Sequence, residues 1–518
     1  MPLPLKGPMR FDRFPFQKEI LNIEEGQVSV LKAAQMGFSI AGIVRTLYVI
    51  AEKGADCLVV LPTQALAGDF AKGRLDSIVA ISPDLKDVFQ RGADSVGLKK
   101  SKKNASLYIR GSVSQRGLVS VPIGTAIVDE LDRCQSGTLE LVRERLSGQL
   151  TKYLFTLSTP TLPDFGIHKE YLSGTREIFC FKCPSCGLHD DLRWPESVVI
   201  CGDGHQDPRC ADSHLQCTHC KTKLPHESKQ EWLATAAWQA SQKCPGHRSF
   251  SINQLYSTTV TPEEFVVASH KSQLSDSAAV EFANQKTGQP FLLANSRLTE
   301  ATINTCRGAH SIHDPRPQDS SKLIVMGVDV GTYLDTCVME YSFPTDPGRE
   351  PYINSTAKLL SVSRIPSSDW GQLDRMMSEW QVRYCVIDFQ PETNLAKAFA
   401  RRFHGFAGLA QYRRGTVGNE IKENIDENFV PTLTVDRTSF LDFALNRFYK
   451  GTITIPHDAG SIFHEHIKAL ARTYQTQDDA MKATYIALAD DHMAHALAYC
   501  EVALLRAFKK STGREINP

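Results

Sequence analysis

Short apolar runs alternate with stretches of helical periodicity in the first part of the chain. The runs at 28–34 and 57–62 are rich in valine and leucine, and helical stretches follow them at 40–52 and 66–81. Runs of this length suit buried strands, whereas the longer periodic stretches suit helices that cover a sheet. The alternation therefore predicts βαβ units and a mainly parallel sheet.

Polar residues directly follow two further strand-like runs, at 126–128 and 153–157. In an open α/β sheet, ligands bind at the carboxyl ends of the strands, so these positions are candidates for a site. From 175 to 250 the composition changes to Cys, His, Gly and Pro with weak periodicity, which is typical of a loop-rich module held by metal. Residues 252–305 look helical and connecting.

A second α/β pattern begins at Lys322, after a polar, proline-containing segment that is typical of a linker. The runs 323–330 and 336–341 resemble a hairpin, and we expect a further strand at 384–387 and a long helix at 483–508. A chain of 518 residues exceeds the size at which a single core keeps growing. Two large domains with smaller insertions are therefore expected.

Charge and composition narrow the function classes. Lysine plus arginine and aspartate plus glutamate each total 58, so no global field attracts a polyanion, and any nucleic-acid contact must come from local patches. No apolar run is long enough to cross a bilayer, and the N-terminal residues lack the apolar stretch of a secretory signal, which favours an intracellular protein. Candidate phosphate contacts, which are equally well explained as solvated charges, are Lys99, Lys100, Lys102, Lys103, Arg401, Arg402, Arg413 and Arg414.

The segment from Lys32 to Ser39 has the context of a phosphate-binding loop. It follows an apolar run and precedes a helical stretch, so backbone N–H groups and a helix N-terminus would meet an anion there. The usual pattern has lysine directly before Ser or Thr, but Phe38 has that place here. Downstream, Asp129 and Glu130 end an apolar strand, where an ATPase would use one carboxylate to hold Mg²⁺ and the other to polarise water. Taken alone, this pair is better explained as an acidic turn in which Asp129 caps a helix.

Paired cysteines predict a zinc site. Of the 14 cysteines, an unusual share lies between Cys180 and Cys220, in a chain without an export signal, where thiols stay reduced. Two CxxC pairs supply the thiolates of a closed tetrahedral zinc site: Cys183 with Cys186, and Cys217 with Cys220. The alternatives are reduced, partly buried cysteines or a redox dithiol, although no thioredoxin-like strand leads into either pair. Further candidate ligands are Cys180, Cys201, His205, Cys210 and His214.

Acidic residues in the second half predict a two-metal site. Asp329 and Asp388 each end an apolar run that ought to be buried, and Asp491 begins a helix. Such acids would hold two Mg²⁺ or Mn²⁺ ions about 4 Å apart, which activate water and stabilise the leaving oxygen. Individually each aspartate suits a helix cap or a surface charge, but burying an unpaired charge is costly, and this favours the joint site. Asp335, Glu392 and His495 are further candidates that are equally well explained as structural.

The N-terminal features, taken in order, resemble the ATPase half of the large terminase subunits of tailed phages. They are residues 14–17, the loop 32–39, residues 61–63, Asp129 with Glu130, and residues 158–160. The lysine-first loop resembles the deviant phosphate loop of the lambda-type packaging family. In the loop, the resemblance implies that Lys32 reaches the β/γ-phosphates, Gly37 lets the backbone approach them, and Ser39 ligates Mg²⁺. It also implies that Gln17 reads the adenine, that Asp129 is the Walker B acid and that Glu130 is the catalytic base. Ser158 and Thr159 would sense the γ-phosphate. The arginine finger stays open among Arg110, Arg116, Arg143 and Arg145.

The resemblance spans nearly the whole chain. Lambda-type subunits have a similar CxxC insertion, and the set Asp329, Asp388 and Asp491 resembles the terminase nuclease, with Asp490 as a substitute for Asp491. It implies an α/β protein with a P-loop ATPase parallel sheet at 1–175, a zinc-ribbon insertion at 176–250, a helical ATPase lid or connector at 251–306, a linker at 307–321 and an RNase H-like nuclease domain at 322–518.

The function implied by this resemblance is ATP-driven movement of viral double-stranded DNA into the prohead, combined with two-metal endonuclease cleavage of concatemeric DNA. The implied cofactors are ATP, Mg²⁺ or Mn²⁺, and Zn²⁺. The implied partners are double-stranded DNA, the small terminase subunit, the portal protein and further copies of the chain in a ring, without a membrane, in the host cytoplasm. Two other functions remain open: a metal-dependent nuclease or recombinase with a degenerate ATPase-like domain, and a zinc-stabilised DNA-binding scaffold without enzymatic activity.

Overall fold

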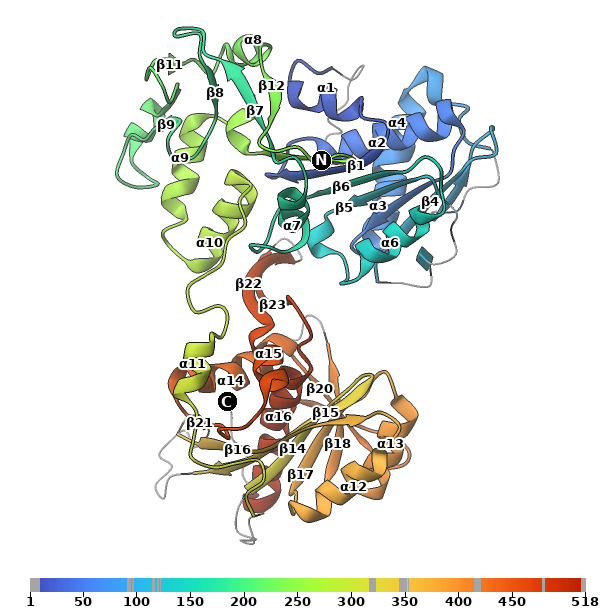
Figure 1. Cartoon of the computed structure of the whole chain (residues 1–518), viewed down its shortest axis with the longest axis vertical. Helices are drawn as coiled ribbons and strands as arrows, with labels where there is room; N and C mark the ends of the chain where they lie inside the picture. The colour runs from blue at the N-terminus through green and yellow to red at the C-terminus, as the bar shows by residue number, and fades with distance from the viewer. Residues whose placement is uncertain are drawn as a thin grey trace. The chain divides into compact units, whose positions relative to one another are not determined.

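The computed structural model describes residues 10–90, 95, 97–113, 117–118, 121, 123–315, 323–343, 352, 354–413, 421–477 and 480–513. The chain divides into two compact units, Met1–Leu292 and Leu293–Pro518 (Figure 1). Each unit has its own hydrophobic core. Both units combine helices with a large sheet, which confirms the predicted α/β class. No helix among the described residues is long and apolar enough to cross a membrane.

The first unit is built on one large, mainly parallel sheet. The strand order is β12-β7-β13-β1-β6-β5-β2-β4-β3, and β8 pairs with β7 at one side. Strands β13, β1, β6, β5, β2 and β4 run parallel to one another, as the alternating pattern predicted, whereas β3 pairs with β4 in antiparallel register. The strands are β1 (Gly26–Lys32), β2 (Cys57–Leu61), β3 (Leu98–Lys100), β4 (Ser106–Gly111), β5 (Thr125–Asp129), β6 (Tyr153–Ser158), β7 (Glu177–Lys182), β8 (His189–Asp191), β12 (Ala237–Ala240) and β13 (His247–Ile252).

Helices cover both faces of this sheet because its central strands are apolar on both sides. Val28 and Val30 of β1 face one core, while Leu31 faces the other. The first core includes residues of α1 (Pro15–Leu21), α2 (Phe38–Tyr48) and α3 (Gln64–Asp69), and the second includes residues of α6 (Thr138–Ser147) and α7 (Gly166–Ser173). The helix predicted at 66–81 consists of α3, a π-helical turn and α4 (Asp76–Ile81).

The cysteine-rich insertion forms a small module of its own beside β7. Its sheet has the order β11-β10-β9, formed by β9 (Val198–Val199), β10 (His214–Gln216) and β11 (Lys223–Leu224), and α8 (Lys229–Leu233) follows. After β13 come the short helix η6 (Gln254–Tyr256), α9 (Pro262–Lys271), α10 (Asp276–Glu281) and the π-helix η7 (Phe282–Thr287). Helix α11 (Glu300–Thr305) contacts α14 and α15, so it lies with the second unit.

The second unit has a mixed sheet with the order β19-β20-β18-β17-β14-β15-β16-β21. The predicted hairpin is confirmed as the antiparallel pair β14 and β15, and the predicted strand at 384–387 is β17, which is parallel to β14. The strands are β14 (Leu323–Val330), β15 (Tyr333–Ser342), β16 (Thr356–Pro366), β17 (Tyr384–Asp388), β18 (Ala407–Tyr412), β19 (Lys422–Ile425), β20 (Pro431–Val435) and β21 (Ile453–Thr454).

Two groups of helices cover the two faces of this second sheet (Figure 1). Helices α12 (Trp370–Glu379) and α13 (Thr393–Arg402) share a core with Met326 and Val328. Helices α14 (Arg437–Lys450), α15 (Ser461–Lys468) and α16 (His492–Thr512) share the other core with Val325 and Val386. Successive residues of β14 therefore face opposite layers, as expected for a strand buried on both sides.

The prediction of one helix over 483–508 was wrong in its first part. Residues 483–487 belong to β23 (Ala480–Ala487), which pairs in antiparallel register with β22 (Leu470–Gln477), and the helix begins only at His492. The apolar residues of β23 suit a helix as well as a strand. The pairing with β22, which the sequence pattern of β23 does not reveal, decides for the strand. Asp491 is the N-cap of α16.

A buried ion pair joins α14 to α16 within the second core. Arg447 Nε donates to Glu501 Oε1 at 2.6 Å, and both side chains are almost fully buried. The hydroxyls of Tyr341 and Tyr352 donate to the same carboxylate, at 2.8 and 2.6 Å. The network satisfies the buried charges, so removal of one partner leaves the other uncompensated.

We expect Arg447→Met to lower the free energy of unfolding of this unit by about 3–5 kcal/mol, because Glu501 would then be a buried charge without its cation. Arg375→Met is the matched control, since the Arg375–Asp369 pair is exposed and contributes less than about 1 kcal/mol. Denaturant titration followed by circular dichroism measures both. Equal changes for the two variants would contradict this assignment.

Candidate functional site

The loop between β1 and α2 is shaped by Gly37 and braced by Gln17. Gly37 has φ +75°, a conformation that favours glycine, and a Cβ atom there would lie 2.7 Å from Gln17 Nε2. Gln17 is buried in α1, and its Nε2 donates to the carbonyl of Met36 at 2.9 Å. Gln17, which the resemblance assigned to the adenine, thus holds the backbone of the loop.

Backbone amides at the end of this loop are free to bind an anion. Among the described residues, no acceptor is found for the N–H groups of residues 35–39, where the loop enters the first turn of α2. The N–H groups of Ala33 and Ala34 are instead used internally, by the carbonyls of Ile252 (2.8 Å) and Gln285 (2.9 Å). An anion would therefore bind at the last part of the loop and at the helix N-terminus.

Lys32, Asp129 and Ser158 are the last residues of three adjacent parallel strands, β1, β5 and β6. Lys32 Nζ lies 2.9 Å from Glu130 Oε1, and Lys32 is 5% exposed. Burial raises the pKa of Asp129, with a further contribution from the charge of Glu130. Burial opposes ionisation of Glu130 as well, but Lys32 holds the pKa of that carboxyl below its ordinary value.

Asp129 has the properties expected of a cation ligand. It is 4% exposed, and its Oδ1 atom has no hydrogen-bond partner among the described residues. Buried polar atoms are otherwise almost always hydrogen-bonded, so an unpartnered carboxylate oxygen at a strand end suits a site for a bound cation. Ser39, the first-turn residue that the resemblance assigned to the same ion, hydrogen-bonds to Asp129 and opposes the rise of its pKa.

Asp132 is a buried carboxylate that the sequence reasoning missed. It accepts hydrogen bonds from the backbone N–H groups of Thr161 (2.8 Å) and Ile167 (2.7 Å) and from the hydroxyl of Thr161. Its own N–H donates to Ser158 Oγ at 3.2 Å, and burial raises its pKa to about 7. Asp132 therefore links the segment after Asp129 to the segment after Ser158, where Thr159 hydrogen-bonds to Glu130.

Several basic candidates are already engaged. Arg143 Nη2 lies 2.6 Å from Glu170, and Arg110 donates to the carbonyls of Gly97 and Ile109. Lys99 is buried and paired with Asp76, so it does not suit a contact with DNA. Of the other candidates, Lys102 pairs with Asp87, Lys103 donates to the carbonyl of Glu52, Arg402 pairs with Asp374, and Arg116 and Arg414 lie outside the described residues.

The two CxxC pairs converge on one point. Cys183 Sγ lies 3.8 Å from Cys220 Sγ, Cys186 Sγ lies 3.9 Å from Cys217 Sγ, and all four sulfur atoms lie within 4.8 Å of one another. Four thiolates about 2.3 Å from a tetrahedral zinc ion would be about 3.8 Å apart, so the spacing fits this metal. All four cysteines are free of disulfides.

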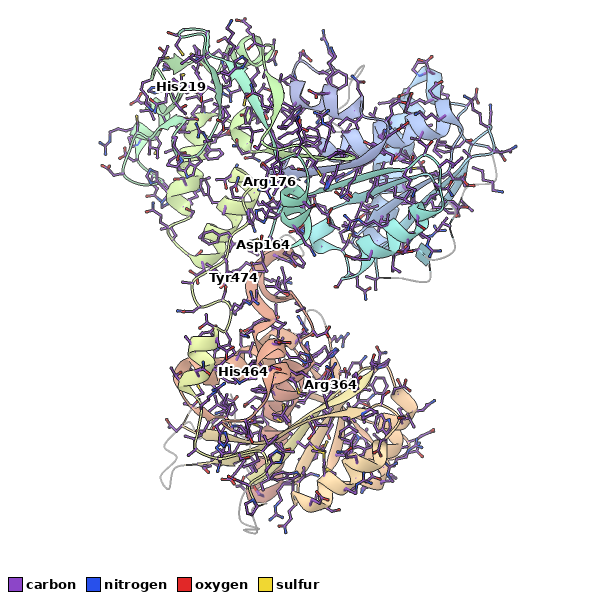
Figure 2. The ribbon with its side chains drawn as sticks, viewed as in Figure 1. Asp164, Arg176, His219, Arg364, His464 and Tyr474 are labelled. Carbon is purple, nitrogen blue, oxygen red and sulfur yellow. The ribbon has the colours of Figure 1, made fainter. Side chains whose placement is uncertain are left out.

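The other candidate ligands of the insertion lie outside this group. Cys180, Cys201, His205, Cys210 and His214 are absent from the cluster. Cys210 Sγ donates to the carbonyl of Gly204, and His214 Nδ1 lies 2.9 Å from the carbonyl of Asp212. His219, labelled in Figure 2, lies between the second pair of ligands and contacts the carbonyl of His189.

The predicted acids of the second unit come from neighbouring elements. Asp329 lies near the end of β14, Asp388 ends β17, and Asp491 caps α16, which packs on both strands. Burial and the charge of Asp329 raise the pKa of Asp388 to about 6. Asp329 and Asp388 therefore act on each other electrostatically, although the oxygen atoms of the three carboxylates do not all lie within 4.8 Å as the cysteine sulfurs do.

Histidine and arginine side chains compensate these acids. His492 Nδ1 lies 2.8 Å from Asp329, which raises the pKa of His492 to about 9. Burial disfavours the charge of Asp491, but the hydrogen bond from His495 Nε2, at 3.2 Å, holds the pKa of Asp491 below its ordinary value. Arg437 lies 3.5 Å from Asp491. The run Asp490-Asp491-His492, with His495 one turn later, was the signal for this arrangement, but the sequence pattern assigned no role to His492.

Asp335 adds a further carboxylate to this cluster. It lies opposite Asp329 in the β14–β15 register, is 1% exposed, and has an Oδ1 atom without a hydrogen-bond partner among the described residues. Burial raises its pKa, and Arg364 of β16, labelled in Figure 2, lies 3.4 Å away and opposes the rise. Arg364 Nε is the atom that pairs with this same Oδ1, so its charge compensates the buried carboxylate of Asp335.

Comparison with protein families identifies the first unit. Residues 4–238 match the model of the phage terminase large subunit gpA, ATPase domain. Over these residues the chain is similar to the ATPase domain of phage terminase large subunits. The terminase ATPase match includes the loop 32–39, the Asp129–Glu130 pair and the cysteine insertion. No curated protein matches the chain.

Solved terminase structures resemble the chain weakly. The large terminase of bacteriophage HK97 is 11% identical, with 96% of each chain covered and a TM-score of 0.43. The large terminase ATPase domain of Thermus phage P74-26 is 13% identical, covers 55% of this chain and 94% of its own, and has a TM-score of 0.33. The large terminase nuclease of thermophilic phage G20c is 12% identical, covers 39% of this chain and 96% of its own, and has a TM-score of 0.25.

We expect the protein to purify with one zinc ion, held by the cysteine cluster, and expect Cys217→Ser to lose it because Cys217 is one of the converging thiols. Cys210→Ser is the matched control, since Cys210 is a buried cysteine of the same insertion outside the cluster. Metal analysis measures the content, and hydrogen exchange over 180–220 measures the local unfolding that should follow zinc removal. Equal zinc in both variants would contradict the site.

Proposed function

We propose that the chain is the large subunit of a tailed-phage terminase, which moves viral double-stranded DNA into a prohead with energy from ATP and cleaves concatemeric DNA with a second, metal-dependent site. The observation that supports this most strongly is the ion pair of Lys32, at the end of β1, with Glu130, directly after Asp129 at the end of β5, inside the region that matches the terminase ATPase model. The carboxylate cluster of the second unit supports the nuclease function.

In the first site, the loop residues bind and the acids act on water. Lys32 would hold the β/γ-phosphates, with the free amides of residues 35–39 around them. Asp129 and Ser39 would hold Mg²⁺, which neutralises charge on the phosphates. Glu130 would then be released from Lys32 and accept a proton from the attacking water. Ser158 and Thr159, beside Asp132 and Glu130, would report the state of the γ-phosphate.

In the second site, Asp329, Asp388 and Asp491 would hold two divalent cations on an RNase H-like sheet, which supply an activated water. The pKa of Asp388 is raised to about 6, so its carboxyl is mainly ionised at neutral pH. A bound cation would lower this pKa and favour the ionised form further. His492 neutralises Asp329 in the cation-free state. The cysteine cluster would hold Zn²⁺ as a structural ion of a zinc ribbon.

The proposed function implies further partners. The motor would need double-stranded DNA, the small terminase subunit and the portal protein of the prohead, and would work as a ring of copies in the host cytoplasm. The zero net charge of the chain suits local and transient contacts with DNA, which a motor must release at each step.

A second candidate function is a metal-dependent nuclease whose first unit hydrolyses no ATP. One observation favours it: the amides of Ala33 and Ala34 are already used, which leaves a shorter stretch of loop for a phosphate. The third function is a DNA-binding scaffold without activity. It would not explain why both units bury carboxylates, since burying a charge costs free energy.

We expect Lys32→Ala to abolish DNA-stimulated ATP hydrolysis, with a loss of at least about 100-fold, because Lys32 is the buried cation that lies 2.9 Å from Glu130 at this strand end and would hold the phosphates. Lys53→Ala is the control, since Lys53 is an exposed lysine of the same unit. Phosphate release in the presence of DNA and Mg²⁺ measures both. ATP hydrolysis at the wild-type rate in Lys32→Ala would exclude the motor and favour the second candidate.

We expect Asp388→Ala to abolish cleavage of plasmid DNA while ATP hydrolysis stays within about twofold of wild type, because the two sites lie in separate units. Asp374→Ala is the control for cleavage, since Asp374 is a surface acid paired with Arg402. Gel analysis with Mn²⁺ or Mg²⁺ measures the products. If Asp388→Ala cleaves as wild type does, the second site is not a nuclease centre.

A further inference from the structure

Residues 253–257, which we call the strap, directly follow β13, the parallel neighbour of β1. They lie between the cysteine insertion and the phosphate loop, two parts of the first unit to which the proposed function gives separate roles. Each residue of the strap makes a hydrogen bond to one of these two parts.

The insertion holds the strap through Leu192, which follows β8. Asn253 Nδ2 donates to the carbonyl of Leu192 at 2.7 Å, and the N–H of Leu192 donates to Tyr256 Oη at 2.9 Å. The Tyr256 hydroxyl in turn donates to the carbonyl of Phe179 in β7. Tyr256 and Leu192 are both almost fully buried, so these bonds are shielded from water.

Lys229 of α8 holds the strap from the other end of the insertion. Its Nζ atom donates to the carbonyls of Leu255 (3.0 Å) and Ser257 (2.8 Å), and the side chain is 1% exposed. Burial lowers the pKa of this amine to about 7. Burying such a group is costly unless it is hydrogen-bonded, so the position of Lys229 is closely tied to the two carbonyls of the strap.

Gln254, in the middle of the strap, contacts the phosphate loop. Its Nε2 atom donates to the carbonyl of Ala34 at 2.9 Å, and the residue is 4% exposed. Ala34 is two residues beyond Lys32 and immediately precedes the free amides. The strap therefore fixes the start of the loop from which Lys32 and these amides extend.

Hydrogen bonds connect the cysteine cluster to β8 and so to Leu192, the residue of the insertion that holds the strap. The N–H of Cys183 donates to the carbonyl of Leu188, directly before β8. Asp190 of β8 accepts from the N–H and the hydroxyl of Thr218, between the second pair of cysteines, both at 2.6 Å. Both CxxC pairs are thus connected by hydrogen bonds to β8 or to the residue before it, and β8 leads directly to Leu192.

We propose that Gln254 and Lys229 are positioning residues for the nucleotide, which transmit the order of the metal-bound cysteine insertion to the phosphate loop. Loss of order in the insertion would release the strap, and the loop would lose its support at Ala34. The insertion would then set the affinity for nucleotide phosphates without touching them. This inference rests on the proposed ATPase function.

Steady-state kinetics with Mg-ATP test it. We expect Gln254→Ala and Gln254→Glu, which both lack the donor to Ala34, to raise KM about 3- to 10-fold with kcat within about twofold, since one buried hydrogen bond that orders the loop is lost. Lys229→Met should act in the same direction. The controls are Gln230→Ala and Lys223→Met, which change exposed residues of the same insertion and should leave KM unchanged.

Binding of a fluorescent ADP analogue, before and after zinc is removed by a chelator, supplies a readout besides activity. In the wild type, chelation should weaken binding of the analogue by a factor similar to the rise in KM of Gln254→Ala. In Gln254→Ala, chelation should weaken binding little further, because both changes break the same connection. Wild-type affinity in Gln254→Ala, or chelation and mutation effects that multiply independently, would overturn the inference while the ATPase function stands. A wild-type chain that neither binds nor hydrolyses nucleotide would overturn both. If Lys229→Met does not fold, the Gln254 variants still decide.

Discussion

The parallel pairing of β6 with β1 on one side and β5 on the other is the constraint on which the first site depends. In this register Leu31 lies opposite Ser158, and Asp129 lies opposite Leu157, so the three strands end at the same level. Lys32 and Glu130 can then meet, and Asp129 stays buried between helices that cover both faces. A slip of one residue would turn each of these side chains to the other face of the sheet.

The second unit applies the same constraint with different chemistry. Asp388 ends β17, whose parallel pairing with β14 brings it to the level of Asp329, while the antiparallel β15 adds Asp335. Both units thus bury carboxylates at strand ends, where isolated charges are costly. Each provides a compensating cation: Lys32 in the first, which a bound phosphate would draw away from Glu130, and His492 in the second, which a bound metal would displace from Asp329. The proposed enzyme is therefore stable without its ligands and prepared to bind them.

Local patterns in the sequence were sufficient for much of the fold. Apolar runs located the strands that end in Lys32, Asp129 and Asp388, and the CxxC spacing located the cysteine cluster. Contacts between distant segments were not accessible in this way. The pairing of β22 with β23 and the burial of Asp132 depend on partners elsewhere in the chain, and a lysine such as Lys229 looks like a surface residue until α8 packs over the strap. Propensity does not encode such partners.

The most direct test of the first site is calorimetric titration of Mg-ATP against wild type and Glu130→Gln, with hydrolysis measured on the same samples. Because Glu130 competes with phosphate for Lys32, its neutral isostere should bind ATP at least as tightly as wild type while hydrolysis falls by at least about 100-fold. Loss of binding together with hydrolysis, or hydrolysis at the wild-type rate, would contradict the arrangement in which Lys32 binds the phosphates and Glu130 activates water.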